Sequence, residues 1–205
     1  MRHSLVLTIS FLAMLLAVPV ASARDATPDA EFVAPDPTEC RVQPRTTEEL
    51  RTFVVDDEAT PDASVTIAAT PEPFVVPPGE PADDATVAGV AATVNEWYAC
   101  LNANAFLQMF ALYTDDYLAR SFAAEGITEY AVDILGTPLD PEPEANWMSI
   151  GVRDIQVLDD GRIGAYITNR SPFGDGNPTE SYVIFVQQGD HYLVDEMIFL
   201  PAEGQ

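Results

Sequence analysis

The chain has 205 residues, with 33 aspartates and glutamates against 9 arginines and no lysine, so its formal net charge is −24. This charge excludes nucleic-acid binding through phosphate neutralisation and docking on anionic lipid, because both need clustered basic side chains. Hydrophobic residues make up 47% and charged residues 20%, which is typical of a globular protein of about one domain with extensions.

The first 23 residues have the pattern of a cleaved secretory signal. A basic start at Arg2 precedes an apolar run over residues 5–20, which is too short to cross a bilayer. The small residues at 21–23 predict cleavage between Ala23 and Arg24, and therefore a secreted or extracytoplasmic protein. An uncleaved membrane anchor is the alternative, and the short apolar run counts against it.

Export predicts a disulfide between Cys40 and Cys100, because paired cysteines are common in oxidising compartments. Two buried thiols are the alternative. The two cysteines and the histidine of the mature chain, His191, lack the close spacing of zinc ligands, so we expect no metal site. Nothing in the sequence indicates a cofactor.

Residues 24–82 are predicted to be a disordered acidic extension rich in proline, threonine and alanine. They contain 10 of the 17 prolines and only three aromatic residues, too few large apolar groups to offset the entropy of ordering. A capping box from Thr46 to Glu49 predicts one short helix over 47–55, docked near Cys40. Residues 56–82 would form a loose tether. The tripeptide Ala-Thr-Pro is repeated in this extension, so a cell-envelope spacer is an alternative function for the protein.

Helical periodicity begins the second part of the chain. Apolar residues step by three and four from Val87 to Leu101 and predict a long amphipathic helix. Asn104 is expected to cap a second helix and Thr114 a third, which Gly126 ends. A fourth helical stretch is predicted over 128–135.

After Asn146 the period changes to that of strands. Four antiparallel strands are predicted in a meander, over 147–158, 163–168, 182–186 and 191–200, with hairpin signals between the first and second and between the third and fourth. Helices followed by a sheet predict an α+β fold.

This order resembles the nuclear-transport-factor-2-like superfamily, and more narrowly the secreted SnoaL-like proteins of bacteria. The segments that carry the resemblance are 97–103, 111–117 and 189–196. It implies a cone-shaped (cystatin-like, SnoaL-like) domain over 83–201, with helices packed on a curved antiparallel sheet, a pocket between them, and a tail over 202–205. The superfamily includes dehydratases and isomerases as well as non-catalytic binding modules, so the fold does not select the function.

The resemblance implies a test for catalytic residues. Ketosteroid-isomerase-like members use a carboxylate base and a tyrosine in an apolar cone. The sequence contains three acids and one tyrosine that could play these roles, namely Asp195, Glu196, Asp140 and Tyr98. The sequence does not identify any of them as catalytic. Since adjacent strand residues point to opposite faces, we expect only Asp195 or Glu196 to enter the pocket. His191 would serve a histidine-based dehydratase, but its position at a turn predicts that it is solvated.

Six aromatic residues could line a pocket or could simply form the core: Trp97, Tyr113, Tyr117, Trp147, Tyr166 and Tyr182. The leading hypothesis is a non-catalytic module that binds a small ligand or another protein. The alternative is an isomerase or dehydratase that uses a pocket carboxylate and a tyrosine. The expected partners are a small apolar ligand or another envelope protein, with a homodimer as a further option.

Overall fold

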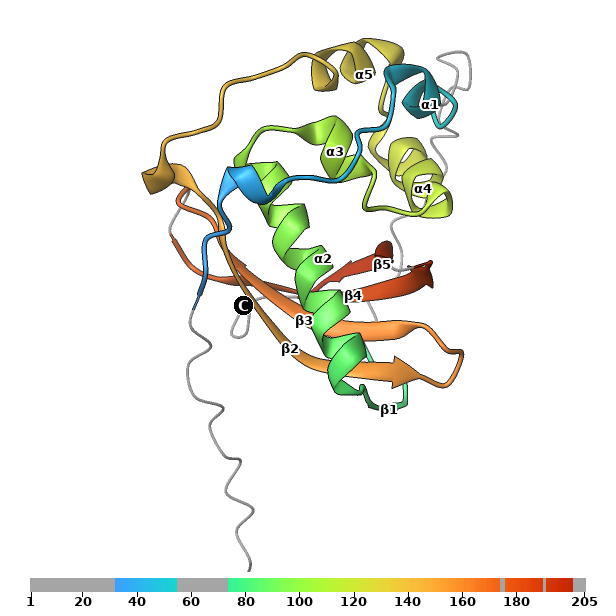
Figure 1. The fold of residues 1–205 in the computed structure, drawn as a ribbon. Coiled ribbons are helices and arrows are strands. Elements are labelled where there is room, and N and C mark those ends of the chain that lie inside the picture. The colour runs from blue at the N-terminus through green and yellow to red at the C-terminus, as the bar shows by residue number, and fades with distance from the viewer. Residues whose placement is uncertain (1–31, 55–73, 174–175, 190, 201–205) are drawn as a thin grey trace, which may run out of the picture.

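The computed structural model describes residues 32–54, 74–173, 176–189 and 191–200. These residues form one five-stranded antiparallel sheet with helices packed against it (Figure 1). The strands follow one another in chain order across the sheet: β1 (Gly79–Pro81), β2 (Ser149–Leu158), β3 (Ile163–Arg170), β4 (Thr179–Gln188) and β5 (His191–Phe199). The predicted α+β architecture is therefore confirmed.

The meander of β2 to β5 agrees with the four predicted strands, but the sheet has a fifth strand that the sequence did not predict. β1 lies in the segment predicted to be disordered and pairs with the end of β2, with Gly79 opposite Leu158. A Cβ on Gly79 would lie 2.5 Å from the Val157 carbonyl oxygen, so only glycine allows this approach. Pro81 is acceptable here because β1 is an edge strand, where a missing N–H is tolerated.

The long helix α2 (Asp84–Asn102) crosses one face of the sheet (Figure 1). Asp83 caps it by accepting a hydrogen bond from the Thr86 N–H. The shorter helices α3 (Phe106–Phe110), α4 (Asp115–Glu125) and α5 (Glu129–Leu135) follow, with a single 3-10 turn, η2 (Glu144–Asn146), before the sheet. As predicted, α4 begins after Thr114 and ends at Gly126, which has the left-handed backbone conformation.

The predicted cap at Asn104 is wrong. Ala105 occupies the N-cap position of α3 and makes no side-chain cap, while Asn104 takes a left-handed backbone conformation with φ 54°. The Asn104 side chain instead donates to the Asp140 carbonyl oxygen at 2.8 Å. A tertiary hydrogen bond therefore replaces the local cap that the sequence suggests.

The two faces of the sheet bury different clusters. On the helix side, Ala165 and Phe185 pack with Val90 and Val94 of α2. On the opposite side, Tyr182 and its neighbours form a smaller cluster with Leu158, Ile184, Phe74, Tyr166 and Ile198. The strict alternation of β3 and β4 produces these two faces, because successive side chains point in opposite directions.

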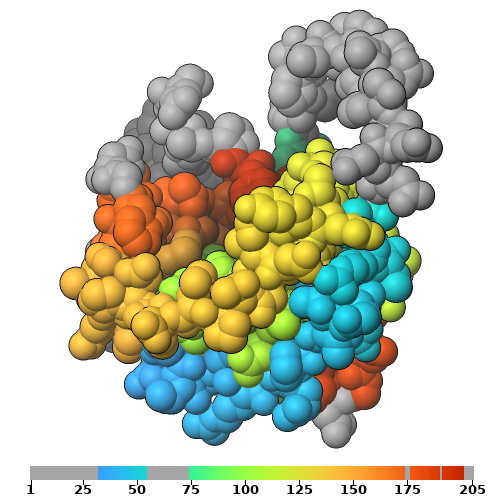
Figure 2. Space-filling view, turned by 90° about the horizontal axis from the view of Figure 1, so that it is seen from above, coloured from blue at the N-terminus to red at the C-terminus, as the bar shows by residue number. Residues whose placement is uncertain are grey.

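Much of the segment predicted as a disordered extension belongs to the folded domain. It contains a 3-10 turn, η1 (Pro37–Glu39), and α1 (Thr47–Arg51), which has the predicted Thr46–Glu49 capping box. The helix ends at Arg51, four residues before the predicted end at 55. Leu50 has no exposed surface and joins the helix-side core. Figure 2 shows α1, in cyan, beside the yellow helices α4 and α5.

The predicted disulfide is present and explains this packing. Cys40 and Cys100 are bonded, with their Cα atoms 4.7 Å apart. The bond holds residues 40–46, called the strap from here on, against α2 and α3. The disulfide and backbone hydrogen bonds thus order a segment that has few aromatic residues. Composition alone did not indicate this order.

Several predictions concern residues outside those described. The signal peptide over 1–23, its cleavage between Ala23 and Arg24, most of the tether, and the tail over 202–205 all lie there. Within the described residues, none of the helices has the length and apolar character needed to span a bilayer.

Candidate functional site

The two candidate acids of β5 contact the same arginine. The Asp195 carboxylate accepts a hydrogen bond from the Thr114 hydroxyl at 2.9 Å and pairs with Arg162 at 3.2 Å. Glu196 lies 3.6 Å from the same guanidinium nitrogen. The sheet explains this arrangement: Ile184 pairs with Glu196 and Phe185 with Val194, so Asp195 is the extra residue of a β-bulge. The alternation used to separate the two acids fails at this bulge.

The other catalytic candidates do not join these acids. Asp140 is exposed, in the loop after α5, and the contact described for it uses its backbone carbonyl. Tyr98 is buried on α2, where its phenol hydrogen-bonds with Asn169 of β3. The described residues therefore do not bring a candidate carboxylate into contact with Tyr98.

The six aromatic candidates are distributed over three places. Trp97, Tyr113 and Tyr117 pack together on the helix side, where the rings of Tyr113 and Tyr117 are stacked at 5.1 Å. Tyr166 and Tyr182 contact each other on the opposite side of the sheet. Trp147 stands apart and donates from its indole nitrogen to the Glu142 carbonyl oxygen at 2.8 Å. Within the described residues, the six aromatic side chains therefore do not form one cluster.

The helix-side aromatic cluster contains buried polar groups. The Trp97 indole nitrogen is buried, and among the described residues no acceptor lies in hydrogen-bond geometry to it. Burial raises the pKa of the Tyr113 phenol well above its usual value, and the neighbouring Tyr117 and Tyr98 phenols raise it further. Burial likewise raises the pKa of the Tyr98 phenol, against the opposing effect of its hydrogen bond with Asn169.

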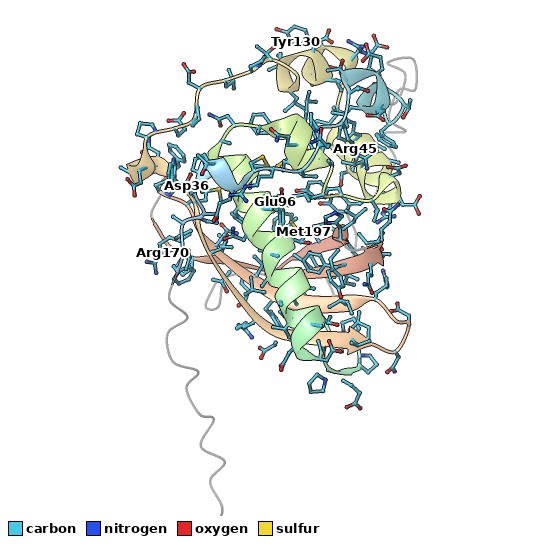
Figure 3. All side chains as sticks on the ribbon, viewed as in Figure 1. Asp36, Arg45, Glu96, Tyr130, Arg170 and Met197 are labelled. Atoms are coloured by element: carbon cyan, nitrogen blue, oxygen red, sulfur yellow. A yellow bond between two sulfur atoms is a disulfide. The ribbon has the colours of Figure 1, made fainter. Side chains whose placement is uncertain are left out.

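These raised pKa values predict a loss of stability in alkaline solution. Above about pH 10 the unfolded chain ionises these tyrosines while the folded protein keeps them protonated, so stability is complete below that pH and falls as the pH rises. Tyr113→Phe should flatten this fall, as measured by urea denaturation from pH 8 to about pH 11. Tyr130→Phe is the matched control, because Tyr130 is 74% exposed on the outer side of α5 (Figure 3). An equal fall in Tyr113→Phe and the wild type would contradict this assignment.

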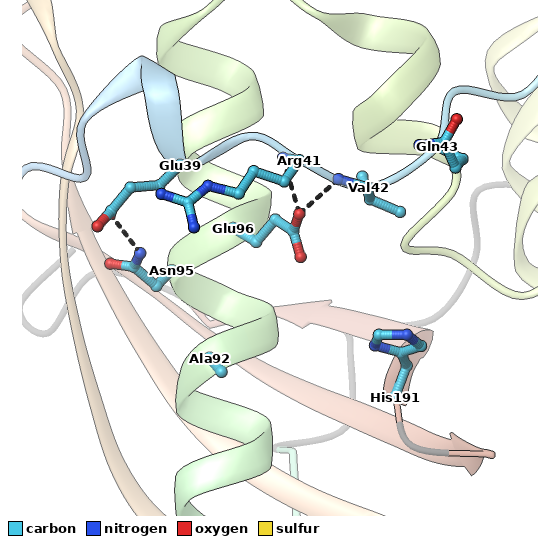
Figure 4. A pocket seen from close by; sticks show the side chains of 8 residues that line it. All are labelled: Glu39, Arg41, Val42, Gln43, Ala92, Asn95, Glu96 and His191. Atoms are coloured by element: carbon cyan, nitrogen blue, oxygen red, sulfur yellow. Dashed lines mark hydrogen bonds between the residues drawn. The ribbon is translucent and has the colours of Figure 1, made fainter.

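A large cleft lies elsewhere, between the strap, α2 and the start of β5 (Figure 4). Its volume is about 650 Å³, within the range of pockets that hold small ligands. We call it the strap cleft. Side chains of both charges and two amides line it, although carbon atoms make up most of its exposed surface. The lining residues are Glu39, Arg41, Val42, Gln43, Ala92, Asn95, Glu96 and His191.

The walls of the strap cleft are held in place by specific bonds. One carboxylate oxygen of Glu96 accepts hydrogen bonds from the backbone N–H groups of Arg41 and Val42, at 2.9 and 2.6 Å. The Asn95 amide donates to Glu39 at 2.7 Å. These contacts fix the strap one helical turn from Cys100, so the cleft is formed before any ligand arrives, which lowers the entropic cost of binding.

Arg45 fixes the far end of the strap. Its guanidinium donates to the backbone carbonyls of Phe110 and Tyr113 and pairs with Asp115 at 2.7 Å, at the start of α4 (Figure 3). A second cleft of about 360 Å³ opens beside this residue and shares Val42 and His191 with the strap cleft. His191 therefore stands between two adjoining hollows, and it is exposed as predicted.

Of the strap-cleft residues, the sequence singled out His191 alone. A usable signal was present for Glu96 and Asn95, which are polar residues four and five positions before Cys100 in the second half of the helix, where most residues are apolar. Once Cys40 is bonded to Cys100, side chains one turn earlier on α2 must face the residues just after Cys40. The predicted disulfide thus implied this contact.

Within the described residues, no group of three or more histidine, cysteine or acidic side chains is arranged to hold a metal ion. Comparison with known proteins adds no relative: no family model matches the chain, and neither a curated protein nor a solved structure is significantly similar to it.

Proposed function

We propose that this protein is an exported, non-catalytic binding module that holds a small polar ligand in the strap cleft. The observation that carries the proposal is the preformed cleft of about 650 Å³, with its walls tied by the disulfide and by Glu96. Among the lining side chains, Arg41 is a hydrogen-bond donor and Glu39 and Glu96 are acceptors, which suits a ligand with hydrogen-bonding groups of both kinds. Val42 and Ala92 supply a small apolar contact.

The contacts of the candidate acids give less support to the isomerase or dehydratase alternative. The Asp195 carboxylate is engaged by Thr114 and Arg162, and neither Asp195 nor Glu196 lines the strap cleft. A general base must reach the proton that it removes. Membership of the SnoaL-like cone proteins remains part of the proposal, supported by helices packed on an antiparallel meander.

Export remains a proposal as well. A disulfide that orders the strap is compatible with an oxidising compartment outside the cytoplasm. The acidic composition suits a protein that stays soluble there. The signal-peptide pattern of the first 23 residues supports the same location.

The proposal predicts that filling the cleft abolishes ligand retention. Ala92 lies on the cleft wall and is exposed, so Ala92→Trp should occupy the cleft without disturbing the core. Native mass spectrometry of protein purified from its secretion medium should show an added mass on the wild type and none on Ala92→Trp.

Ala91→Trp is the matched control, since Ala91 is an exposed neighbour on the same helix that does not line the cleft. It should retain the added mass. The proposal fails if Ala92→Trp keeps the ligand, or if the wild type carries none and binds none from the concentrated medium.

A further inference from the structure

A third hollow lies on the helical side of the molecule and shares no lining residue with the strap cleft. It has a volume of about 270 Å³, is open to solvent on one side, and is lined by the turn before α3, α3 itself, the end of α5 and Pro44 of the strap. Figure 2, seen from above, shows the green α3 region between the gold segment that follows α5 and the blue segment that contains the strap. We call this hollow the α3–α5 pocket.

The chemistry of the α3–α5 pocket differs from that of the strap cleft. Among the described residues, none of those that line it carries a charge, although one residue in five of the whole chain is charged. Aliphatic, aromatic and proline side chains supply most of its surface: Pro44, Phe106, Leu107, Leu135, Pro138 and Leu139. A charged ligand would lose its hydration here without gaining an ionic partner.

The polar side chains around the α3–α5 pocket already have partners. The Gln108 amide donates to the carbonyl oxygens of Cys40 and Val42, at 3.3 and 3.1 Å. The Thr137 hydroxyl donates to the Asp133 carbonyl oxygen at 3.0 Å. Water needs two to four polar partners to be well held, and this lining offers few, so an apolar occupant is favoured over ordered water.

The α3–α5 pocket is also held open. Asn104 donates to the Asp140 carbonyl oxygen, a bond that ties the turn before α3 to the loop after α5. At the end of α5, the Gly136 N–H donates to the Val132 carbonyl oxygen at 2.9 Å. A Cβ on Gly136 would lie 2.5 Å from the Thr47 methyl group, so α5 packs closely on α1. These ties keep the walls from collapsing onto one another.

We propose that the α3–α5 pocket binds a small uncharged apolar molecule, separately from the ligand of the strap cleft. The volume is just below that of pockets for drug-sized ligands, which points to an occupant of about ten non-hydrogen atoms. Short alkyl or single-ring compounds with at most one neutral polar group have this size and character. This second site does not depend on the function proposed for the strap cleft.

The probe for the test is 1-octanol, with octanoate as a charged molecule of nearly equal length. Titration of the full-length secreted protein with octanol, followed by ¹H–¹⁵N NMR, should show saturable shifts centred on residues 103–108 and 135–139. Octanoate should bind at least about tenfold more weakly, because its charge finds no partner in the lining. Equal or tighter binding of octanoate would overturn the proposal.

Two variants locate the site. Leu139→Asp places a charge in the lining at a residue that is 52% exposed, and it should weaken octanol binding at least about tenfold. Ile134→Asp is the matched control, because Ile134 is 50% exposed and does not line the pocket. It should leave the affinity unchanged. The proposal is overturned if octanol shows no saturable binding, if its shifts centre elsewhere, or if the protein covers this surface by dimerising in solution.

Discussion

Removal of the disulfide, with Cys40→Ser and Cys100→Ala together, is expected to lower the free energy of unfolding by about 3–4 kcal/mol. The bond joins residues separated by 60 positions, so it restricts a long loop in the unfolded chain. Alanine is chosen at 100 because that side chain is fully buried among apolar groups, where a hydroxyl would lack a partner. Urea denaturation of the wild type and the double variant measures the difference.

Reduction of the wild type provides the control for the disulfide prediction. Dithiothreitol should lower the urea midpoint of the wild type towards that of the double variant and leave the double variant unchanged. Equal midpoints for the oxidised wild type and the double variant would show that the bond does not stabilise the fold. Hydrogen exchange should increase first in the strap, because the bond pins it to α2.

Leu50→Ala is expected to destabilise the protein by about 3 kcal/mol, a value typical of a fully buried leucine. Leu50 lies on α1, in the segment that composition assigns to a disordered extension, yet it has no exposed surface. The loss would therefore measure how firmly this segment belongs to the core. Thermal and urea denaturation give the free energy.

Leu139→Ala is the matched control for Leu50→Ala, since it removes the same atoms from a side chain that is 52% exposed. It should cost less than about 0.5 kcal/mol. Similar effects of the two substitutions would indicate that α1 contributes no more to the core than a surface loop does.

Much of the architecture could be predicted from local patterns. The three-and-four spacing in α2 reports which face of the helix is buried, and the alternation in β3 divides its side chains between the two faces of the sheet, both of which carry buried clusters. The caps at Thr46 and Thr114 act within one helical turn and were predicted from sequence, whereas Asn104 is drawn into a tertiary hydrogen bond instead of capping α3. The cysteine pair was predictable because only two cysteines are present.

The errors arise where distant segments meet. β1 was missed because a three-residue edge strand with a proline has no recognisable period, and its pairing depends on the end of β2. Asp195 and Glu196 were expected on opposite faces, but a bulge against Ile184 and Phe185 interrupts the alternation. The aromatic candidates share residue type without sharing a location, since those in α2 and those in β3 and β4 lie on different sides of the sheet.

The acidic composition predicts, without any structure, that this protein does not bind nucleic acid or anionic membranes through a basic surface, because its 9 arginines are outnumbered by 33 acids. Local sequence also predicted the order of the helices and of strands β2 to β5, but not β1. Only the tertiary structure decided where cavities lie: the strap cleft exists because Glu96 and the disulfide hold residues 40–46 across α2. A cleft is the space between surfaces that long-range contacts bring together, and those contacts leave no periodic trace in the chain.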